Sequence, residues 1–145
     1  MPRLAKQGLQ DFLFGGNIAK IATIDENGLP YINPVWYEWD GKSFYVIARA
    51  KSRFLANIRK NNNVAVCVDI STKPYTRVTA QGKASILSGF DWIPMGRRMA
   101  LRYLGESGLA SYLDGTLKLE RAVIRIDPTS IQSWTGMDWH PRYTS

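Results

Sequence analysis

Three cations and a hydroxyl lie within one five-residue segment, Arg49-Ala-Lys51-Ser52-Arg53. The segment joins a predicted strand to the first turn of a predicted helix, for which Ser52 is the expected N-cap. The first backbone N–H groups of a helix are unpaired and lie at the positive end of its dipole, so they bind phosphate readily. Nearby lysine and arginine add charge-assisted hydrogen bonds. The segment is typical of a phosphate site, and equally of a solvated basic turn.

Pro34 interrupts an otherwise regular predicted strand over residues 30–39. Proline has no N–H to donate to a sheet, so it marks an edge strand or a bulge. Either arrangement leaves backbone groups near Val35 and Trp36 free to meet a planar heterocycle. A plain edge strand without a ligand is the other interpretation of the same residues.

Signatures of other enzyme classes are missing from the sequence. Gly15-Gly16 lacks the spacing of a dinucleotide or Walker loop. The only histidine, His140, is far in sequence from the only cysteine, Cys67, so we predict no metal site. We expect Cys67 to be a buried apolar residue and His140 to lie on the surface or in a lid. Redox chemistry in such a chain would depend on an organic cofactor.

The composition is that of one globular domain. The chain has 145 residues, of which 45% are hydrophobic, and we treat residues 1–145 as a single domain. Its net charge of +7 favours anionic partners, namely phosphates, nucleic acid or a membrane surface. A lone cysteine excludes an intrachain disulfide, and no apolar stretch approaches the roughly 20 residues that span a bilayer. We expect a cytoplasmic protein.

Turn signals divide the chain into short elements. Asn27-Gly28 and Asp40-Gly41 are typical of hairpins, because these pairs tolerate positive φ. Apolar alternation predicts strands at 17–24, 30–39, 43–49, 64–70, 75–87 and 120–126, with 130–135 extending the last strand past a stop at Asp127-Pro128. Helical periodicity predicts helices at 4–14, at 52–60, from Asp91 onward with Trp92, Met95, Met99 and Tyr103 on one face, and near 107–113.

This order of elements predicts a mainly β protein with flanking helices. Consecutive hairpins favour antiparallel pairing. Apolar residues on both faces of six strands favour a closed or half-closed barrel, because a flat sheet would leave one face in water.

Several short segments together carry a resemblance to a known family. They are Ala22-Thr23, Asn27 to Tyr31, Asn33 to Trp36, Ala48 to Arg53, Leu55 to Ile58, Arg77 to Ala84, and Pro128 with Ile131 to Trp134. In this order and spacing, over about residues 10–134, the chain resembles the pyridoxamine 5′-phosphate oxidase-like split-barrel family. That family includes FMN-binding and deazaflavin-dependent reductases.

The resemblance implies a six-stranded antiparallel split barrel of the FMN-binding type and a homodimer with two cofactor sites at its interface. By the same resemblance, the cofactor phosphate meets the basic turn and the ring lies along the second strand. The implied cofactor-binding residues are Asn33, Pro34, Val35, Trp36, Val46, Ile47, Ala48, Lys51, Ser52, Arg53, Arg77 and Trp134. The segment after Trp134 is more similar to the reductases than to the vitamin B6 oxidases, and no catalytic residue is assigned.

The leading hypothesis is an FMN-dependent oxidoreductase that acts on a small molecule and binds neither nucleic acid nor membrane. The deazaflavin coenzyme F420 is a close competitor to FMN, because its acidic tail suits a charge of +7. A second class is a basic β-barrel that binds single-stranded nucleic acid, for which five Trp and seven Tyr offer stacking surfaces. A third is a module that binds a flavin without catalysis.

Overall fold

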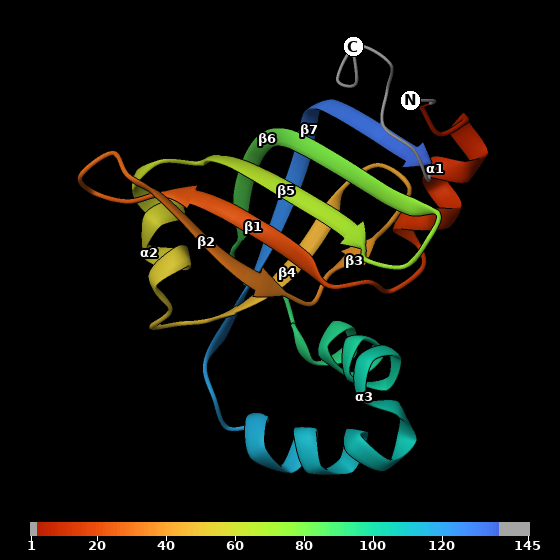
Figure 1. Ribbon diagram of the computed structural model, residues 1–145. Coiled ribbons are helices and arrows are strands. Elements are labelled where there is room, and N and C mark those ends of the chain that lie inside the picture. Colours follow the sequence, from red (N-terminus) through yellow and green to blue (C-terminus); the bar gives the residue numbers. More distant parts are fainter. Residues whose placement is uncertain (1–2, 137–145) are drawn as a thin grey trace.

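The computed structural model describes residues 3–136, which form one sheet and three helices (Figure 1). In chain order the elements are α1 (Lys6–Leu13), β1 (Ala19–Ile24), β2 (Pro30–Val35), β3 (Glu38–Trp39), β4 (Phe44–Arg49), α2 (Arg53–Lys60), β5 (Asn63–Ile70), β6 (Tyr75–Leu87), α3 (Ile93–Thr116) and β7 (Arg121–Gly136). None of these helices is long and apolar enough to cross a bilayer.

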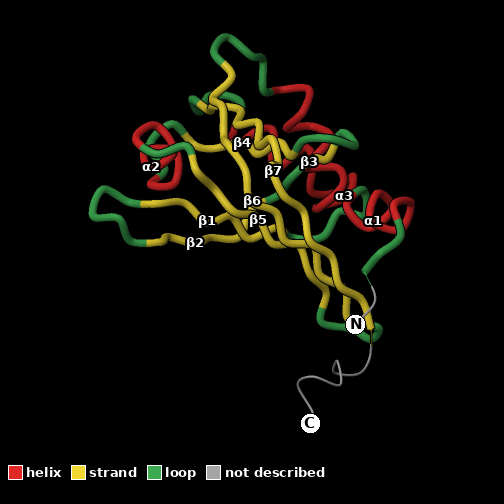
Figure 2. The backbone as a smooth tube through the Cα atoms, turned by 90° about the horizontal axis from the view of Figure 1, so that it is seen from above, coloured by secondary structure: helices red, strands yellow, loops and turns green. Residues whose placement is uncertain are grey.

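The sheet is antiparallel, with the strand order β2-β1-β5-β6-β7-β4-β3. Its strands curl into a half-barrel, which Figure 2 shows from above. The predicted fold class is therefore confirmed, with β3 as a short seventh strand. The core lies inside the curl, where alternate residues of the strands meet Phe54, Leu55 and Ile58 of α2 and Leu13 of α1.

The predicted strand at 30–39 is wrong in one respect, because the structure divides it into β2 and β3 on opposite edges of the sheet. The chain crosses between the edges at Trp36 and Tyr37. Tyr37 is fully buried, and its hydroxyl donates to the carbonyl of Leu13 at 2.7 Å. Its backbone N–H donates to the hydroxyl of Tyr103 at 3.3 Å instead of to a strand. At this point the hydrogen bonds of the buried Tyr37 take the place of hydrogen bonds to a neighbouring strand.

The predicted stop at Asp127-Pro128 is also wrong, because β7 continues through it to Gly136. The pairing with β6 shifts register between Gln81 and Gly82, opposite Pro128. A proline is tolerated in a strand at such a bulge, where its missing N–H interrupts no ladder bond.

The two predicted helical pieces after Asp91 are one element, α3, with a break at Gly105 (φ 73°, ψ 179°). An Asp91 carboxylate oxygen accepts from the N–H of Ile93 at 3.1 Å near its start. Figure 1 shows α3 lying to one side of the half-barrel, between the end of β6 and the start of β7. The predicted apolar face is confirmed, since Trp92, Met95 and Met99 are buried against Val123 and Tyr103 packs beside them.

Substitution of Gly82 tests the bulge. A Cβ on Gly82 would lie 2.3 Å from the backbone oxygen of Asp127, so the strand pair would have to separate. We expect Gly82→Ala to lower the free energy of unfolding by about 1–3 kcal/mol in urea denaturation. Gly115→Ala is the matched control, because a Cβ there meets nothing within 4 Å and alanine favours a helix. Equal stability of the two variants would contradict the close approach.

Candidate functional site

A cavity of about 790 Å³ lies between the half-barrel and α3. Its walls come from the ends of β2 and β4, the turn before α2, the start of β7 and one side of α3. The lining residues are Ile18, Asn33, Pro34, Val35, Trp36, Ile47, Arg49, Ser52, Phe54, Met99, Leu104, Tyr112, Thr116 and Arg121. The volume suits an organic molecule of cofactor size.

Unpartnered polar atoms converge on this cavity. Within residues 3–136, three buried side-chain nitrogen or oxygen atoms have no hydrogen-bond partner: Asn33 Oδ1, Ser52 Oγ and Arg121 Nε. All three residues line the cavity. A buried polar group left unpaired costs about 1–3 kcal/mol, so such groups normally have partners. The cavity is therefore suited to a ligand that offers a donor to Asn33 and an acceptor to Arg121.

The four predicted residues of the second strand all lie on the cavity wall, namely Asn33, Pro34, Val35 and Trp36. As the Pro34 pattern indicated, β2 is an edge strand, paired only with β1 among the described strands. The indole of Trp36 is held in place by Tyr103, on which it stacks at 5.1 Å and 6° between ring planes, and by Tyr112 at 5.6 Å. The result is a rigid aromatic wall beside free strand backbone.

Strand β4 contributes one of its three predicted residues to the wall. Ile47 lines the cavity. Val46 and Ala48 are 2% and 1% exposed and belong to the core on the other face of the strand, because successive side chains alternate. Only their backbone groups remain available to a ligand.

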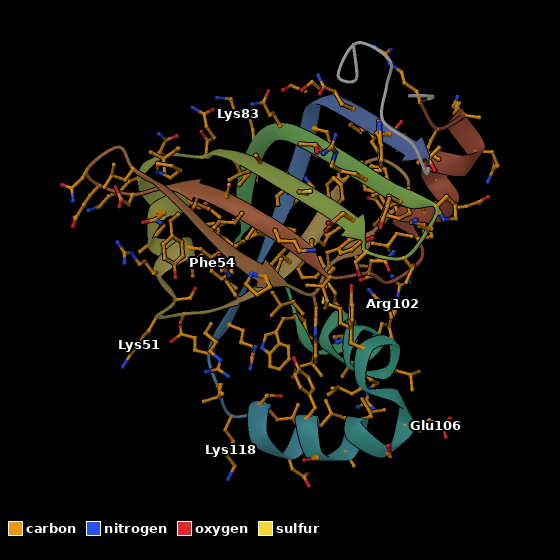
Figure 3. All side chains as sticks on the ribbon, viewed as in Figure 1. Lys51, Phe54, Lys83, Arg102, Glu106 and Lys118 are labelled. Atoms are coloured by element: carbon orange, nitrogen blue, oxygen red, sulfur yellow. The ribbon has the colours of Figure 1, made fainter. Side chains whose placement is uncertain are left out.

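The basic turn divides into residues that face the cavity and residues that do not. Arg49 and Ser52 line it. Lys51 points away from the barrel into solvent (Figure 3). Arg53 Nη2 lies 3.6 Å from a carboxylate oxygen of Asp25, and its guanidinium sits over the ring of Tyr31 at 4.9 Å. Phosphate binding by Lys51 and Arg53 stays a prediction.

Ser52 precedes α2 as predicted, but its hydroxyl makes no capping hydrogen bond. The capping prediction is wrong because the Ser52 Oγ is buried beside the cavity without a partner. The position that would cap an ordinary helix is here available to a ligand.

Arg77 and Trp134 lie far along the sheet from the cavity. They face each other across β6 and β7, with the guanidinium 5.6 Å from the indole ring. The other end of the same β7 strand begins with Arg121, which lines the cavity. This chain by itself therefore does not bring Arg77 and Trp134 to the other site residues. His140 lies outside the described residues. Cys67, expected to be buried, is half-buried on β5.

Sequence reasoning missed Arg121 and the wall formed by α3. The guanidinium of Arg121 lies 5.3 Å from the ring of Trp92 and 5.9 Å from that of Tyr112. Met99, Leu104, Tyr112 and Thr116 complete this side. No linear pattern connects Arg121 with the basic turn, because the two meet only through the pairing of β4 with β7.

The described lining has no carboxylate, imidazole or thiol that could serve as a general acid or base. Two tyrosines stand behind the wall, and burial raises the pKa of both Tyr37 and Tyr103, so both stay protonated at neutral pH. The hydroxyl of Tyr103 donates to the carbonyl of Asn17 at 2.9 Å, which is a structural role. Residues 3–136 also hold no cluster of metal-ligating side chains. The lining therefore offers hydrogen-bonding and aromatic groups rather than an acid-base pair or a metal centre.

The family model for pyridoxamine 5′-phosphate oxidase matches residues 5–135. The chain belongs to this family. No curated protein matches its sequence.

Solved structures with the same fold differ in what they bind. An FAD-binding protein from Mesorhizobium loti is 17% identical, with a TM-score of 0.69, and the match covers 94% of this chain and 97% of that one. An F420 reductase is 24% identical, with a TM-score of 0.66 and coverages of 84% and 94%. The heme storage protein HutZ from Vibrio cholerae is 18% identical, with a TM-score of 0.68 and coverages of 93% and 96%. At these identities the likeness shows the fold alone.

Substitution of Ser52 tests whether its hydroxyl is reserved for a ligand. Loss of an N-cap hydroxyl typically costs about 1 kcal/mol. Because Ser52 Oγ is buried without a bond, we expect Ser52→Ala to leave the free energy of unfolding unchanged or to raise it. The matched control is Ser43→Ala, since the Ser43 hydroxyl donates to Asp127 at 2.6 Å and its loss costs about 1 kcal/mol. A destabilisation by Ser52→Ala as large as that of Ser43→Ala would contradict this assignment.

Proposed function

We propose that the protein is an FMN-dependent oxidoreductase that acts on a small molecule. The observation that carries the proposal is the convergence of three unpartnered polar atoms, on Asn33, Ser52 and Arg121, on one cavity. Family membership supports it, because a flavin carries both hydrogen-bond donors and acceptors, which can partner these three atoms. When bound, the flavin supplies the hydride chemistry.

The chain's own residues bind and orient. In this proposal the edge of β2, from Asn33 to Trp36, holds the ring, and the turn around Ser52 receives the phosphate. The aromatic and aliphatic wall of α3 excludes water from the other side and shapes the space for a substrate. The described lining has no carboxylate, imidazole or thiol, so in this proposal its residues act mainly by positioning.

The deazaflavin coenzyme F420 is the alternative cofactor. It shares a ring, a ribityl chain and a phosphate with FMN, and an F420 reductase shares the fold. Its acidic tail would meet the exposed cations outside the cavity, including Lys51 and Arg53. A competition binding experiment with FMN and F420 on the purified protein shows which cofactor binds more tightly.

We also propose a homodimer, in which a second copy completes the site. The exposed apolar side chains of Leu29, just before β2, and Ile32, within β2, support this, since they are 60% and 66% exposed in one chain. In such a dimer Arg77 and Trp134 would reach the partner's cavity. The cytoplasmic location stays a prediction.

A module that binds its cofactor without catalysis is the second candidate. It is favoured by the lack of a carboxylate, imidazole or thiol on the described lining. The fold also serves a heme storage protein. Reduction of the bound flavin by NADPH, followed as loss of its oxidised absorption band, separates an oxidoreductase from a storage module.

Titration of the purified protein tests the proposed function. We expect FMN to bind with a dissociation constant of about 1 μM or below, with quenching of flavin fluorescence, because ring and phosphate are both held. Single-stranded oligonucleotide serves as the control ligand, since the chain carries +7. Tight, salt-sensitive oligonucleotide binding without binding of FMN or F420 would favour a nucleic-acid function instead.

Light scattering tests the assembly. We expect a particle of twice the 16.4 kDa chain mass at micromolar concentration, because apolar side chains exposed in one chain would be buried. Ile32→Lys should shift the species toward monomer and weaken FMN binding together. Full FMN binding by a clean monomer would count against a shared site.

A further inference from the structure

Two arginines face each other on the cavity wall. Arg49 ends β4, Arg121 begins β7, and the two residues are direct partners in the antiparallel register. Both line the cavity. Side chains directly opposite on neighbouring strands lie close together, so two cations in this relation repel each other. Water solvates Arg49, which is exposed, whereas the Nε of Arg121 is buried.

No carboxylate among the described residues pairs with either arginine. The ion pairs of this part of the chain involve Lys20, Arg53, Lys60, Arg98 and Arg125, and no carboxylate lies within 4 Å of Arg49 or Arg121. Arg121 Nε is buried and unpartnered, and its guanidinium is fixed beside the rings of Trp92 and Tyr112. The side chain is thus preorganised while its hydrogen-bonding capacity is unused.

Ser52 completes the group. Its hydroxyl is also buried and unpartnered on the same wall, three residues after Arg49. Two guanidinium groups and a hydroxyl are donors, and together they match the oxygens of a phosphate or a carboxylate.

We propose that Arg49, Arg121 and Ser52 form an oxyanion site on the cavity wall, and that this group neutralises the negative charge of the ligand, rather than Lys51 and Arg53, which do not line the cavity. Arg53 has Asp25 as its counter-ion and Lys51 points into solvent. The oxyanion belongs either to the cofactor phosphate, in which case the inference rests on the proposed function, or to an acidic substrate. The site itself does not depend on which of them supplies it.

Inorganic phosphate probes the site without any flavin. At about ten times its dissociation constant, phosphate should raise the melting temperature of the wild-type protein by about 3–6 °C relative to chloride of equal ionic strength. Arg121→Met and Arg49→Met should each remove most of that shift. Arg59→Met is the matched control, because Arg59 is an exposed arginine on the last turn of α2 and its loss should leave the shift intact.

A comparison of FMN with riboflavin identifies the source of the oxyanion. If the cofactor phosphate occupies the site, Arg121→Met weakens FMN binding about 10- to 100-fold and leaves riboflavin binding unchanged. Arg53→Ala then binds FMN with nearly the wild-type affinity. The other outcome is that Arg121→Met leaves the ratio of the FMN and riboflavin dissociation constants unchanged while it removes the melting-temperature shift by phosphate. In that case the oxyanion belongs to the substrate, and the site still stands.

The proposal is overturned if phosphate gives no shift in the wild-type protein, or if the shift survives in both Arg121→Met and Arg49→Met. It is also overturned if Arg53→Ala, and neither of the other two variants, abolishes the shift. Should Arg121→Met fail to fold, Arg121→Lys keeps the charge without the planar fork, and a reduced but measurable shift is expected. A protein that binds phosphate at this site but no flavin would refute the proposed function and leave the site intact.

Discussion

The pairing of β6 with β7 holds the rest of the structure in position. The two strands run antiparallel from Tyr75 opposite Gly136 to Leu87 opposite Val123, and they bend at the bulge beside Gly82. One side of this ladder carries β5, β1 and β2, and the other carries β4 and β3. Because the ladder bends, the two halves of the sheet curl toward each other, and the ends of β2 and β4 come to share a cavity. The helix α3 joins the two strands at one end of the ladder, so it lies beside that cavity.

A second constraint is the burial of Tyr37. Its hydroxyl reaches α1 and its backbone reaches Tyr103 on α3, so the chain between the two edges of the sheet is fixed from both sides. The neighbouring Trp36 is thereby held on the cavity wall, stacked on the same Tyr103. The wall owes its rigidity to contacts made behind it, which leaves the face toward the cavity free for a ligand.

The distribution of charge divides the site from its surroundings. Most exposed cations have a carboxylate within reach or face open water, where an ion pair contributes little. On the cavity wall, by contrast, Arg121 and the Ser52 hydroxyl have buried polar atoms without partners, and Arg121 lies beside the ring of Trp92. Electrostatic interactions are stronger at such buried atoms. In the proposed function such a protein contributes orientation and charge, and the cofactor contributes the reactive group.

The sequence by itself determined the local features. Turn chemistry placed the hairpins, alternation placed the strand at 75–87 with its observed bounds, and Pro34 indicated an edge strand. The quoted motifs also indicated the family and brought Asn33 to Trp36 and Ser52 into the candidate site.

Only the tertiary structure decided which cations face the cavity. Arg49 lies opposite Arg121, 72 residues further along the chain, because β4 pairs with β7. Arg53 instead forms an ion pair with Asp25. It also decided that the run at 30–39 crosses the sheet, because the partner of Tyr37 lies on α3. Local periodicity indicates which face of a strand is apolar. It does not indicate which distant strand will lie beside it, because that depends on how the whole sheet curls.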